Sequence, residues 1–377
     1  MPNTQNTREP IRILGLMTGS SADGLDICLV EFTGLDTKPE FRILHSTEIP
    51  YPDHFRSAFI NPLELSKEQI NTLDQELGQW FATEVSKLNL NFDVIASHGQ
   101  TISHNPPIST LQIGNPKFMS DQFNVPVIYD FRTADIKQGG QGAPLIPIVD
   151  RLLFQRNDTD ILALNIGGIS NLTIVPGKHN PAPLLAWDTG PGNTLIDKAV
   201  RVFSRGKLNY DPEGSIAAQG FAYPKLLEHL LNHKFYDITP PRSAGQEQFG
   251  KLYFENMLKL FLHSTDQQFK DIIYTLTVLT ARTIADACLD ISNNYTPNTM
   301  FVAGGGVYNH TLLKLIKTYL PEIIVKRVDH LGVTESNKEA FGFAYLGYLH
   351  LLNLPGNIPS VTGAKQEVVL GKLFPPT

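Results

Sequence analysis

Asp188 stands where a reactive carboxylate would be expected. It follows the apolar run from Leu184 to Trp187 and precedes the glycine-rich segment Thr189 to Asn193. A carboxylate at the end of a buried strand can face a cleft and act as a general base. Aspartate is also an ordinary turn residue, and it could instead organise this turn or cap the helical run from Leu195 to Phe203. The residue types alone leave both roles open.

One strand-turn-strand segment near the start of the chain has a turn of small residues. Apolar runs from Ile11 to Met17 and from Leu25 to Phe32 flank the segment Thr18-Gly19-Ser20-Ser21-Ala22-Asp23-Gly24. The backbone N-H groups of such a turn can close on phosphate oxygens, and Ser20 and Ser21 add hydroxyl donors. The sequence contains neither a P-loop nor a dinucleotide-binding glycine pattern, so a bound triphosphate would need a device of this kind.

The same plan recurs in the middle of the chain. Apolar runs from Asp160 to Ile166 and from Asn171 to Val175 flank Gly167-Gly168-Ile169-Ser170, and Ser170 supplies a third hydroxyl. Two such turns could clamp a triphosphate, which would make the repeat an internal duplication. The alternative is that both are ordinary glycine hairpins of a sheet protein.

A triple glycine marks a further candidate site. Gly304-Gly305-Gly306 follows the run from Thr299 to Val302 and leads to Asn309. Glycines at this point let a planar group or a phosphate approach the backbone closely. A tight turn from a strand into a helix is the alternative.

His98 and Glu339 are two polar residues at the ends of expected elements. His98 follows the apolar run from Val94 to Ala96, and it either contacts a ligand or is a structural histidine. Glu339 opens a helical run to Leu352 and lies three residues after Ser336, which is the spacing of a capping box. Glu339 is therefore either a helix cap or a contact to a substrate hydroxyl.

Strands and helices alternate around these residues. Apolar spacings of three and four predict one helix from Phe249 to His263 and a longer one from Asp271 to Tyr295. The apolar stretch from Phe341 to Leu354 is too short to span a membrane, which takes about 20 residues, and is expected to be a core helix. The alternation predicts an α/β fold of sheets with helices outside.

Composition narrows the function. The chain has 377 residues, of which 42% are hydrophobic and 18% charged, as in a soluble protein with two domains or one bilobed unit. The net charge of -6 and the pI of about 6.0 argue against a protein surface that binds nucleic acid or an anionic membrane. They favour a small-molecule partner. Cys28 and Cys288 have no metal-ligand spacing and are expected to be buried thiols. Met1 to Pro10 lacks a signal-peptide core, which predicts a cytoplasmic protein.

Ordered motifs along the chain resemble those of the anhydro-N-acetylmuramic acid kinase family. They are Met17 to Asp26, Ser97 to Thr101, Asp130 to Arg132, Gly139 to Leu145, Asn165 to Asn171, Asp188 to Asn193, Gly304 to Asn309, Lys338 to Ala340 and Thr362 to Ala364. They span nearly the whole chain, and so many motifs in the same order are hard to attribute to chance.

The resemblance implies the fold of the actin, hexokinase and heat-shock ATPase superfamily. In that fold, two ribonuclease H-like lobes surround an ATP cleft, which would explain the duplicated hairpins. By this analogy, residues 1–140 and about 355–377 form the first lobe and residues 141–354 form the second.

The resemblance also implies roles for individual residues. Asp188 matches the catalytic aspartate, and His98, Arg132 and Glu339 match positions that line the sugar side. ATP is the phosphate donor, with Mg²⁺ bound mostly through ATP and water and no other metal site. The residues that match nucleotide-binding positions are Gly19, Ser20, Ser21, Ala22, Asp23, Gly24, Leu25, Asp26, Gly167, Gly168, Gly304, Gly305, Gly306 and Asn309.

The implied reaction opens 1,6-anhydro-N-acetylmuramic acid with water and phosphorylates its 6-oxygen, in peptidoglycan recycling. A conventional sugar kinase and a non-sugar ATPase of the same superfamily are the alternatives. Gln246 replaces an arginine of the family pattern, which removes a cation and a bidentate donor and leaves the identity of the sugar open. In the turn from Thr18 to Gly24, serine and threonine are exchanged relative to the family pattern, so the hydroxyl groups are kept. The oligomeric state is left open, a homodimer included.

Overall fold

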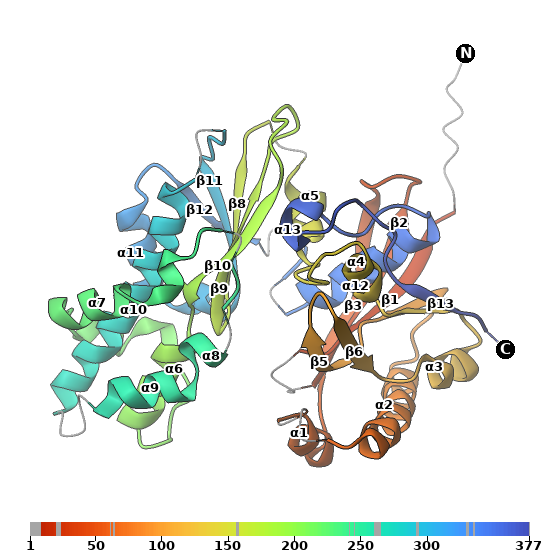
Figure 1. Ribbon diagram of the computed structural model, residues 1–377, viewed down its shortest axis with the longest axis horizontal. Coiled ribbons are helices and arrows are strands. Elements are labelled where there is room, and N and C mark those ends of the chain that lie inside the picture. The colour runs from red at the N-terminus through yellow and green to blue at the C-terminus, as the bar shows by residue number, and fades with distance from the viewer. Residues whose placement is uncertain are drawn as a thin grey trace. The chain divides into compact units, whose positions relative to one another are not determined.

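The chain divides into two compact units, one made of residues 1–152 with 332–377 and one of residues 153–331 (Figure 1). Strands and helices mix in both, as the sequence predicts. The computed structural model describes residues 9–19, 24–60, 62, 65–155, 158–240, 242–244, 246–259, 265–291, 294–328, 332–334 and 336–376.

The first unit is built on a six-stranded sheet of order β13-β7-β4-β1-β2-β3. β1 pairs antiparallel with β2 and parallel with β4, and β4 pairs parallel with β7. The carboxyl ends of β1, β4 and β7 therefore meet at one edge of the sheet. The strands are β1 (Ile11–Met17), β2 (Gly24–Thr33), β3 (Glu40–Pro50), β4 (Val94–Ser97), β7 (Val127–Tyr129) and β13 (Lys372–Phe374), and a separate hairpin joins β5 (Gln100–Asn105) to β6 (Ser109–Ile113).

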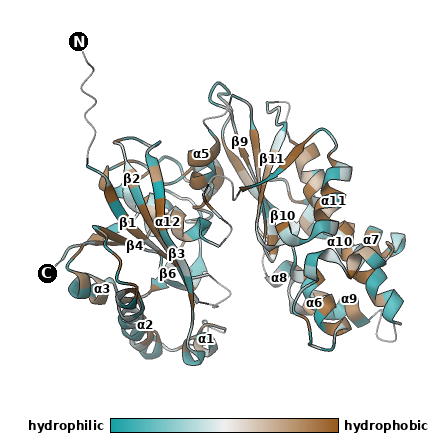
Figure 2. Ribbon diagram, turned by 180° about the vertical axis from the view of Figure 1, so that it is seen from behind, coloured by the Kyte–Doolittle hydropathy of each residue, from teal (hydrophilic) through white to brown (hydrophobic). Residues whose placement is uncertain are grey.

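The second unit repeats this plan. Its sheet has the order β10-β9-β8-β11-β12, in which an antiparallel hairpin again precedes two parallel strands. Figure 2 shows hydrophobic residues along β9 and β11, and β11 is buried throughout. Each unit thus has the ribonuclease H-like strand order, and the predicted duplication is confirmed. The strands are β8 (Ile161–Ile166), β9 (Ile169–Val175), β10 (Leu185–Pro191), β11 (Thr299–Ala303) and β12 (Ile324–Arg327).

Helix α12 (Lys338–Leu351) belongs to the first unit, although the resemblance places it in the second lobe. It packs on β1, β2 and β4 so closely that a Cβ on Gly15 would lie 2.0 Å from the Ala340 carbonyl oxygen. The predicted core helix is confirmed. The expected boundaries at residues 140 and 354 differ from the observed ones because α12 packs on the first sheet and most of α5 (Pro147–Phe154), whose Val149 lies beside Gly342 of α12, belongs to the same unit. The other helices here are α1 (Asp53–Ile60), α2 (Lys67–Lys87), α3 (Pro116–Phe123), α4 (Thr133–Lys137) and α13 (Pro359–Thr362).

Helix α10 (Asp266–Leu289) forms the core of the second unit and packs against α6, α7, α11 and β10. Among the described helices it alone is long and apolar enough to cross a membrane, but 72% of that window is buried inside the protein. It starts five residues before the predicted Asp271 because Thr265 caps it. The remaining helices are α6 (Thr194–Phe203), α7 (Pro224–Leu231), α8 (Gln246–Phe249), α9 (Lys251–Leu258) and α11 (His310–Tyr319).

The helix predicted from Phe249 to His263 is present as α9, but it starts two residues later than predicted, at Lys251. Gly250, at the N-cap position of α9, takes an extended conformation, so Phe249 belongs to the separate short helix α8. Phe249 is buried among the rings of His233, Phe235 and Tyr253. Residues 260–264 lie outside the described part of the chain.

The two cysteines are free thiols. Cys28 is buried in β2 and Cys288 is half-buried in α10. Burial raises the pKa of each thiol to about 12, so neither is a ready nucleophile.

Candidate active site

Asp188 lies within β10 rather than at its end, at an irregularity in the pairing with β9. The register shifts between Asp188 and Gly190, and such a bulge re-aims the side chain next to it. The Asp188 carboxylate accepts a hydrogen bond of 2.6 Å from the backbone N-H of Ala244. Its backbone N-H donates to the Arg242 carbonyl at 2.9 Å. Residues far apart in sequence therefore hold Asp188 in place.

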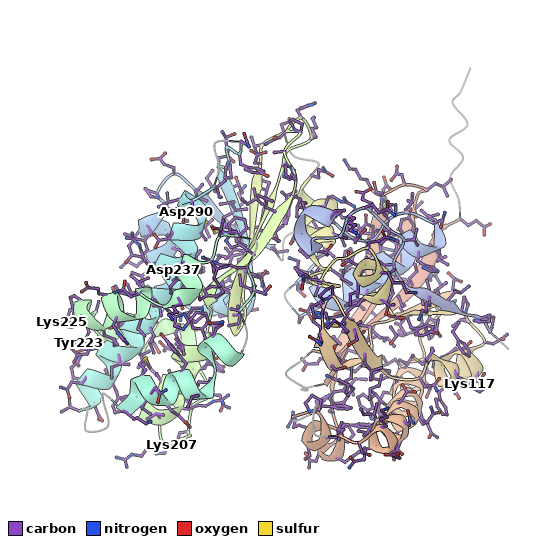
Figure 3. The ribbon with its side chains drawn as sticks, viewed as in Figure 1. Lys117, Lys207, Tyr223, Lys225, Asp237 and Asp290 are labelled. Carbon is purple, nitrogen blue, oxygen red and sulfur yellow. The ribbon has the colours of Figure 1, made fainter. Side chains whose placement is uncertain are left out.

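The segment that carries Ala244 is held by Arg242. The Arg242 guanidinium donates to the carbonyl oxygens of Tyr236 at 3.0 Å and Ile238 at 2.9 Å, and it lies 4.8 Å from the ring centre of Phe235. Its Nε also donates to the Asp188 carbonyl at 3.2 Å. Burial lowers the pKa of Arg242, whereas its interactions with Tyr236, Asp290 and Asp188 act in the opposite direction; Figure 3 labels Asp290. The side chain of Gln246 lies outside the part of the chain that is described.

Burial raises the pKa of Asp188 to about 6, against the opposing effects of the Ala244 N-H and Arg242. A carboxylate of this kind is ionised at neutral pH and is a stronger base than an ordinary aspartate. Its partner lies 56 residues away, and the N-cap of α6 is Asn193. Asp188 therefore does not cap α6.

The turn at Gly167 and Gly168 packs against the segment that follows Asp188. The two glycine carbonyls accept hydrogen bonds from the N-H groups of Gly192, Asn193 and Thr194, at 2.8 to 3.1 Å. A Cβ on Gly192 would lie 2.3 Å from the Gly167 carbonyl oxygen. The candidate base and the second small-residue turn are thus parts of one packed cluster.

The expectation that Ser170 donates its hydroxyl to a phosphate is wrong. Ser170 and Thr189 are both fully buried, and their hydroxyls bond to each other. The Ser170 hydroxyl also donates to the Gly190 carbonyl at 3.4 Å. It therefore holds β9 to β10 instead of facing a ligand.

The triple glycine lies at the same edge of the second sheet as the turn at Gly167 and Gly168. This follows because β11 runs parallel to β8, and Ala303 pairs with Asn165. Gly304 has a φ of +92°, and a Cβ there would lie 2.5 Å from the Ile166 backbone. A Cβ on Gly306 would lie 2.4 Å from the Ile166 side chain. Packing against Ile166 thus accounts for Gly304 and Gly306, whereas Gly305 is exposed.

Asn309 is buried and serves as the N-cap of α11. Its side-chain oxygen accepts a hydrogen bond of 2.9 Å from the Leu312 N-H. A helix begins here, beside the triple glycine, and the amides of its first turn form the type of positive end that suits a phosphate.

The first small-residue turn is described only in part. Gly19 ends the described segment, Ser20, Ser21, Ala22 and Asp23 lie outside the described residues, and β2 begins at Gly24. Leu25 is fully buried in the core of the first unit, so only its backbone could face a nucleotide. Asp26 pairs with Met17 across the hairpin.

His98 and Arg132 follow β4 and β7, so their strands bring them to one edge. Arg132 Nε donates to His98 Nε2 at 3.0 Å. Burial and then the Arg132 charge hold the pKa of His98 well below its usual value, so the ring is neutral. Burial lowers the pKa of Arg132 to about 10, and the Glu339 carboxylate opposes this effect. Arg132 therefore remains a cation at neutral pH.

The first turn joins this edge through two hydrogen bonds. The Thr18 hydroxyl donates to the Gly99 carbonyl at 2.9 Å, and the Gln100 amide donates to the Gly19 carbonyl at 3.3 Å. The ends of β1 and β4 are therefore linked at the point where the turn leaves the sheet.

Glu339 lies in the first turn of α12, and its side chain is exposed. The capping-box alternative is wrong, because Asn337, not Ser336, is the N-cap. The Asn337 side chain accepts a hydrogen bond from the Thr334 N-H at 2.8 Å instead of capping the helix. The neighbouring Lys338 forms a buried ion pair of 2.5 Å with Asp150.

Several positioning groups could not be found from the sequence. Asp135 is fully buried, and its carboxylate accepts hydrogen bonds from Asn357, Thr362 and the Gly142 N-H at 2.7 to 2.8 Å. It thereby ties the Gly139-to-Leu145 motif to the Thr362-to-Ala364 motif. Asp150 and Ala244 have no motif of their own that points to these contacts. Among the described residues, no group of three or more His, Cys, Asp or Glu side chains could hold a metal ion.

The family match and the similar proteins of known name point to one family. The sequence matches the family described as anhydro-N-acetylmuramic acid kinase over residues 11–376. A relative of that name from Bacillus cereus (strain G9842) is 38% identical, with 97% of this chain and 99% of the relative covered. One from Prochlorococcus marinus (strain MIT 9303) is 37% identical, with 96% and 98% covered.

A solved structure, the activator of the 2-hydroxyisocaproyl-CoA dehydratase from Clostridium difficile with bound ADPNP, aligns with a TM-score of 0.38. It is 10% identical, with 89% of this chain and 93% of that chain covered, and so low a score supports no inference. The sequence match, in contrast, starts at the first residue of β1, extends past β13 and includes the motifs of both units. The chain therefore belongs to the anhydro-N-acetylmuramic acid kinase family, a family of carbohydrate kinases.

Proposed function

We propose that this protein uses ATP to convert 1,6-anhydro-N-acetylmuramic acid into N-acetylmuramic acid 6-phosphate, in the recycling of cell-wall sugars. The family supports a kinase of an amino sugar. The observation that carries the proposal is Asp188, a carboxylate with a pKa of about 6 that the Ala244 N-H holds in a fixed orientation. We place the reaction in the cytoplasm, where ATP is available.

The reaction needs one base. Asp188 takes a proton from water, and the resulting hydroxyl attacks the anomeric carbon. The bond from that carbon to the sugar's own 6-oxygen breaks, and the 6-oxygen takes the γ-phosphoryl group of ATP as ADP leaves. An ordinary glycosidase needs a second carboxyl group to protonate the departing oxygen, but here the phosphoryl group takes that place. A single carboxylate is therefore sufficient.

We assign the ATP phosphates to the two small-residue turns, Gly19 to Asp26 and Gly167 to Gly168. The exposed Gly305, beside the start of α11, is assigned to the nucleoside side together with Gly304, Gly306 and Asn309. The packing of the triple glycine against Ile166 supports this grouping within the second unit. Mg²⁺ would be bound through ATP oxygens and water, and it would neutralise charge during phosphoryl transfer.

We assign His98, Arg132 and Glu339 to the sugar. Arg132 is a cation with a planar set of donors, which suits the carboxylate of the substrate's lactyl group. The hydrogen bond from Arg132 to His98 supports a fixed guanidinium, and the exposed Glu339 carboxylate can accept from a sugar hydroxyl.

The test is ATP consumption by the purified protein with Mg²⁺ and 1,6-anhydro-N-acetylmuramic acid, free N-acetylmuramic acid or no sugar. The proposal expects ADP only with the anhydro sugar. Turnover with the free sugar alone would indicate a conventional sugar kinase, and turnover without sugar would indicate an ATPase with another purpose.

Two variants sharpen this test. Asp188→Asn should abolish most of the turnover. Asp197→Asn is the matched control, because burial also raises the pKa of Asp197 to about 6 but this carboxylate lies on α6. If both variants lost activity equally, Asp188 would have no special role.

A further inference from the structure

Gln100 belongs to the Ser97-to-Thr101 motif, but it has no part in the function proposed above. It stands at the start of β5, and its side chain is only 2% exposed. A buried amide needs partners for two N-H groups and one carbonyl oxygen, because leaving them unpaired is costly. Two of the partners of Gln100 come from segments far away in the sequence.

The amide nitrogen of Gln100 holds the first small-residue turn. Nε2 donates to the Gly19 carbonyl at 3.3 Å and to the Thr101 carbonyl at 3.5 Å. Gly19 is the first residue of the segment that we assign to the ATP phosphates. A peptide group is planar, so a fixed Gly19 carbonyl fixes the plane of the peptide group with which the turn begins.

The amide oxygen of Gln100 is held by Tyr51. The Tyr51 hydroxyl donates to Gln100 Oε1 at 3.1 Å, and its ring is 4% exposed, among aromatic rings of α1 and α2. Burial raises the pKa of Tyr51, so the hydroxyl keeps its proton and can donate. A flipped amide would place its oxygen against two carbonyl oxygens, which only accept. Tyr51 therefore fixes which end of the amide faces Gly19.

A second hydrogen bond ties the same two segments. Thr18 is 2% exposed, and its hydroxyl donates to the Gly99 carbonyl at 2.9 Å. Gly99 has a φ of +73°, and a Cβ there would lie 2.5 Å from the Ile113 carbonyl oxygen of β6. The segment that receives the turn is thus itself packed closely against its neighbour.

The same short segment carries a residue of the sugar side. His98, which we assign to the sugar, directly precedes Gly99, and its backbone N-H donates to the Leu16 carbonyl at 3.0 Å. Residues 98–100 therefore connect the sugar side of the first unit with the first residues of the phosphate turn. Phosphoryl transfer depends mainly on the alignment of donor and acceptor, and a displacement of about 1 Å disturbs it.

We propose that Gln100 and Thr18 are positioning residues that fix the phosphate turn on the segment carrying His98 and thereby align ATP with the sugar, an inference that rests on the proposed function. Both N-H groups of Gln100 and the Thr18 hydroxyl are engaged within the protein. Their loss should therefore reduce turnover by displacing the turn, and not by removing a contact to the sugar.

Gln100→Met is the direct test, because methionine has a similar length and no N-H group in its side chain. With ATP and 1,6-anhydro-N-acetylmuramic acid, kcat should fall about 10- to 100-fold, since a displaced turn misaligns the phosphoryl group. The KM for the sugar should change by less than about 3-fold. The melting temperature should also fall, because the Tyr51 hydroxyl loses its acceptor.

A double variant separates positioning from stability. Gln100→Met combined with Tyr51→Phe removes the hydroxyl that has lost its acceptor, so the melting temperature should recover in part. The Gly19 carbonyl is released in both variants, so kcat should stay low. Recovery of kcat together with the melting temperature would reduce Gln100 to a structural role and overturn the inference.

Thr18→Val tests the second tie, and Ser120→Ala is its matched control. Ser120 is fully buried in the same unit, and its hydroxyl donates to the carbonyls of Val125 and Pro375 at 3.0 Å. Both variants should lower the melting temperature, but only Thr18→Val should lower kcat, by about 3- to 10-fold. An equal kcat in the two variants would remove Thr18 from the positioning role.

Nucleotide binding supplies an arm that does not depend on the sugar. Calorimetry measures the binding of the ATP analogue AMPPNP with Mg²⁺, and of adenosine, to the wild type and to Gln100→Met. The displaced turn should weaken AMPPNP binding about 3- to 10-fold and leave the binding of adenosine, which has no phosphate, unchanged. An equal loss for both ligands, or none for either, would show that Gln100 does not act on the phosphate turn.

This design separates the two proposals. Wild-type protein that binds AMPPNP but consumes no ATP with the anhydro sugar would contradict the proposed function, and the affinity of Gln100→Met for AMPPNP would still decide whether Gln100 holds the turn. Normal turnover and normal AMPPNP affinity in Gln100→Met would overturn the positioning role alone.

Discussion

The central residue of the site, Asp188, is held by groups that would keep an ordinary carboxylate acidic, yet its pKa is raised. The Ala244 N-H and the Arg242 charge both favour the ionised form, and burial outweighs them. The outcome is a carboxylate that titrates near pH 6, which suits a base that must work at neutral pH.

The pH dependence of the reaction follows from this pKa. Because a base must be unprotonated, kcat/KM for the anhydro sugar should fall as the pH drops through about 6. Asp188→Asn should lower kcat about 10² to 10⁴-fold and remove that limb of the profile. Initial rates between pH 5 and 9 test this. An acidic limb that persists in the residual activity of the variant would assign it to another group.

The same pKa predicts an effect on stability. The folded protein binds a proton at Asp188 up to about pH 6, whereas an unfolded aspartate loses it near 3.8, so stability falls as the pH rises through this window. Asparagine carries no charge and keeps an acceptor for the Ala244 N-H. Asp188→Asn should therefore melt at a higher temperature than the wild type at pH 8.

Thermal melts at pH 8 and pH 4 provide the measurement, and the lower pH is the internal control. At pH 4 the wild-type carboxyl is protonated in the fold, so the difference between the two proteins should nearly vanish. A variant that melts at a lower temperature than the wild type at pH 8 would show that the Asp188 charge supports the fold instead of opposing it.

Strand ends were the most useful signal at the residue scale. His98 and Arg132 follow parallel strands, and their direct hydrogen bond places the two side chains together; that they bind the sugar stays a prediction. The prediction that the Ser170 hydroxyl faces a phosphate was wrong because a hydroxyl in a turn can point into the sheet as well as out of it. Ala244 could not be predicted, since its contact with Asp188 spans 56 residues and uses only backbone atoms.

At the scale of elements, the loop before α8 acts as a support for β10. Arg242 makes hydrogen bonds to several loop carbonyls, and a lysine has neither the geometry nor the number of donors to replace it. Arg242→Lys should loosen the segment up to Ala244, weaken the hydrogen bond to Asp188 and raise the pKa of that carboxyl further.

The measurement is again the pH profile. The acidic limb of kcat/KM should move to higher pH in Arg242→Lys. Arg282→Lys is the control, because Arg282 pairs with Asp286 on the exposed side of α10 and should leave the profile unchanged. An unmoved limb in Arg242→Lys would show that the loop does not tune Asp188.

Helix α10 supports the same strand from the other side. The Thr280 hydroxyl is buried and lies 2.9 Å from the Pro191 carbonyl oxygen and 2.8 Å from that of Gly192, at the end of β10. Thr280→Val should reduce the free energy of unfolding by about 1–3 kcal/mol, because these buried carbonyls lose a donor. Urea denaturation measures the change.

Thr277→Val is the matched control for this loss. Thr277 is also buried in α10, but its hydroxyl donates to the Ile273 carbonyl within the same helix. That carbonyl keeps its helical partner when the hydroxyl is removed, so the change should be smaller. Equal losses in the two variants would show that the contact to β10 adds nothing.

The strands were predictable from alternating apolar runs and turns of small residues, and β1 has the predicted ends. The helix expected from Phe249 starts two residues late because periodicity cannot reveal that Gly250 leaves the helical conformation. The early start of α10 has a local cause, a capping box formed by Thr265 and Gln268.

At the scale of the whole molecule, the first unit is discontinuous in sequence and the second is not. Residues 332–377 supply α12, which packs on β1, β2 and β4. A boundary placed by analogy could not anticipate this, because helix α12 is apolar on most sides and its sequence does not show which sheet it covers.

This arrangement predicts how fragments behave. Residues 153–331 contain a complete sheet, α10 and their own cores, so they should fold cooperatively when expressed alone. Residues 1–152 lack α12, which leaves Phe32 without the stacked ring of Tyr348 and exposes the face of β1 around Gly15. This fragment should remain largely unfolded or aggregate until residues 332–377 are supplied in trans.

Circular dichroism and urea unfolding of the separate and mixed fragments measure whether each fragment folds alone or only with its partner. A gain of structure on mixing 1–152 with 332–377 is expected, and 332–377 carrying Ala340→Leu serves as the matched control. Ala340 is fully buried in the intact protein, so extra volume at this position should prevent docking. Cooperative folding of residues 1–152 alone would show that α12 is an accessory to the first sheet and not part of its core.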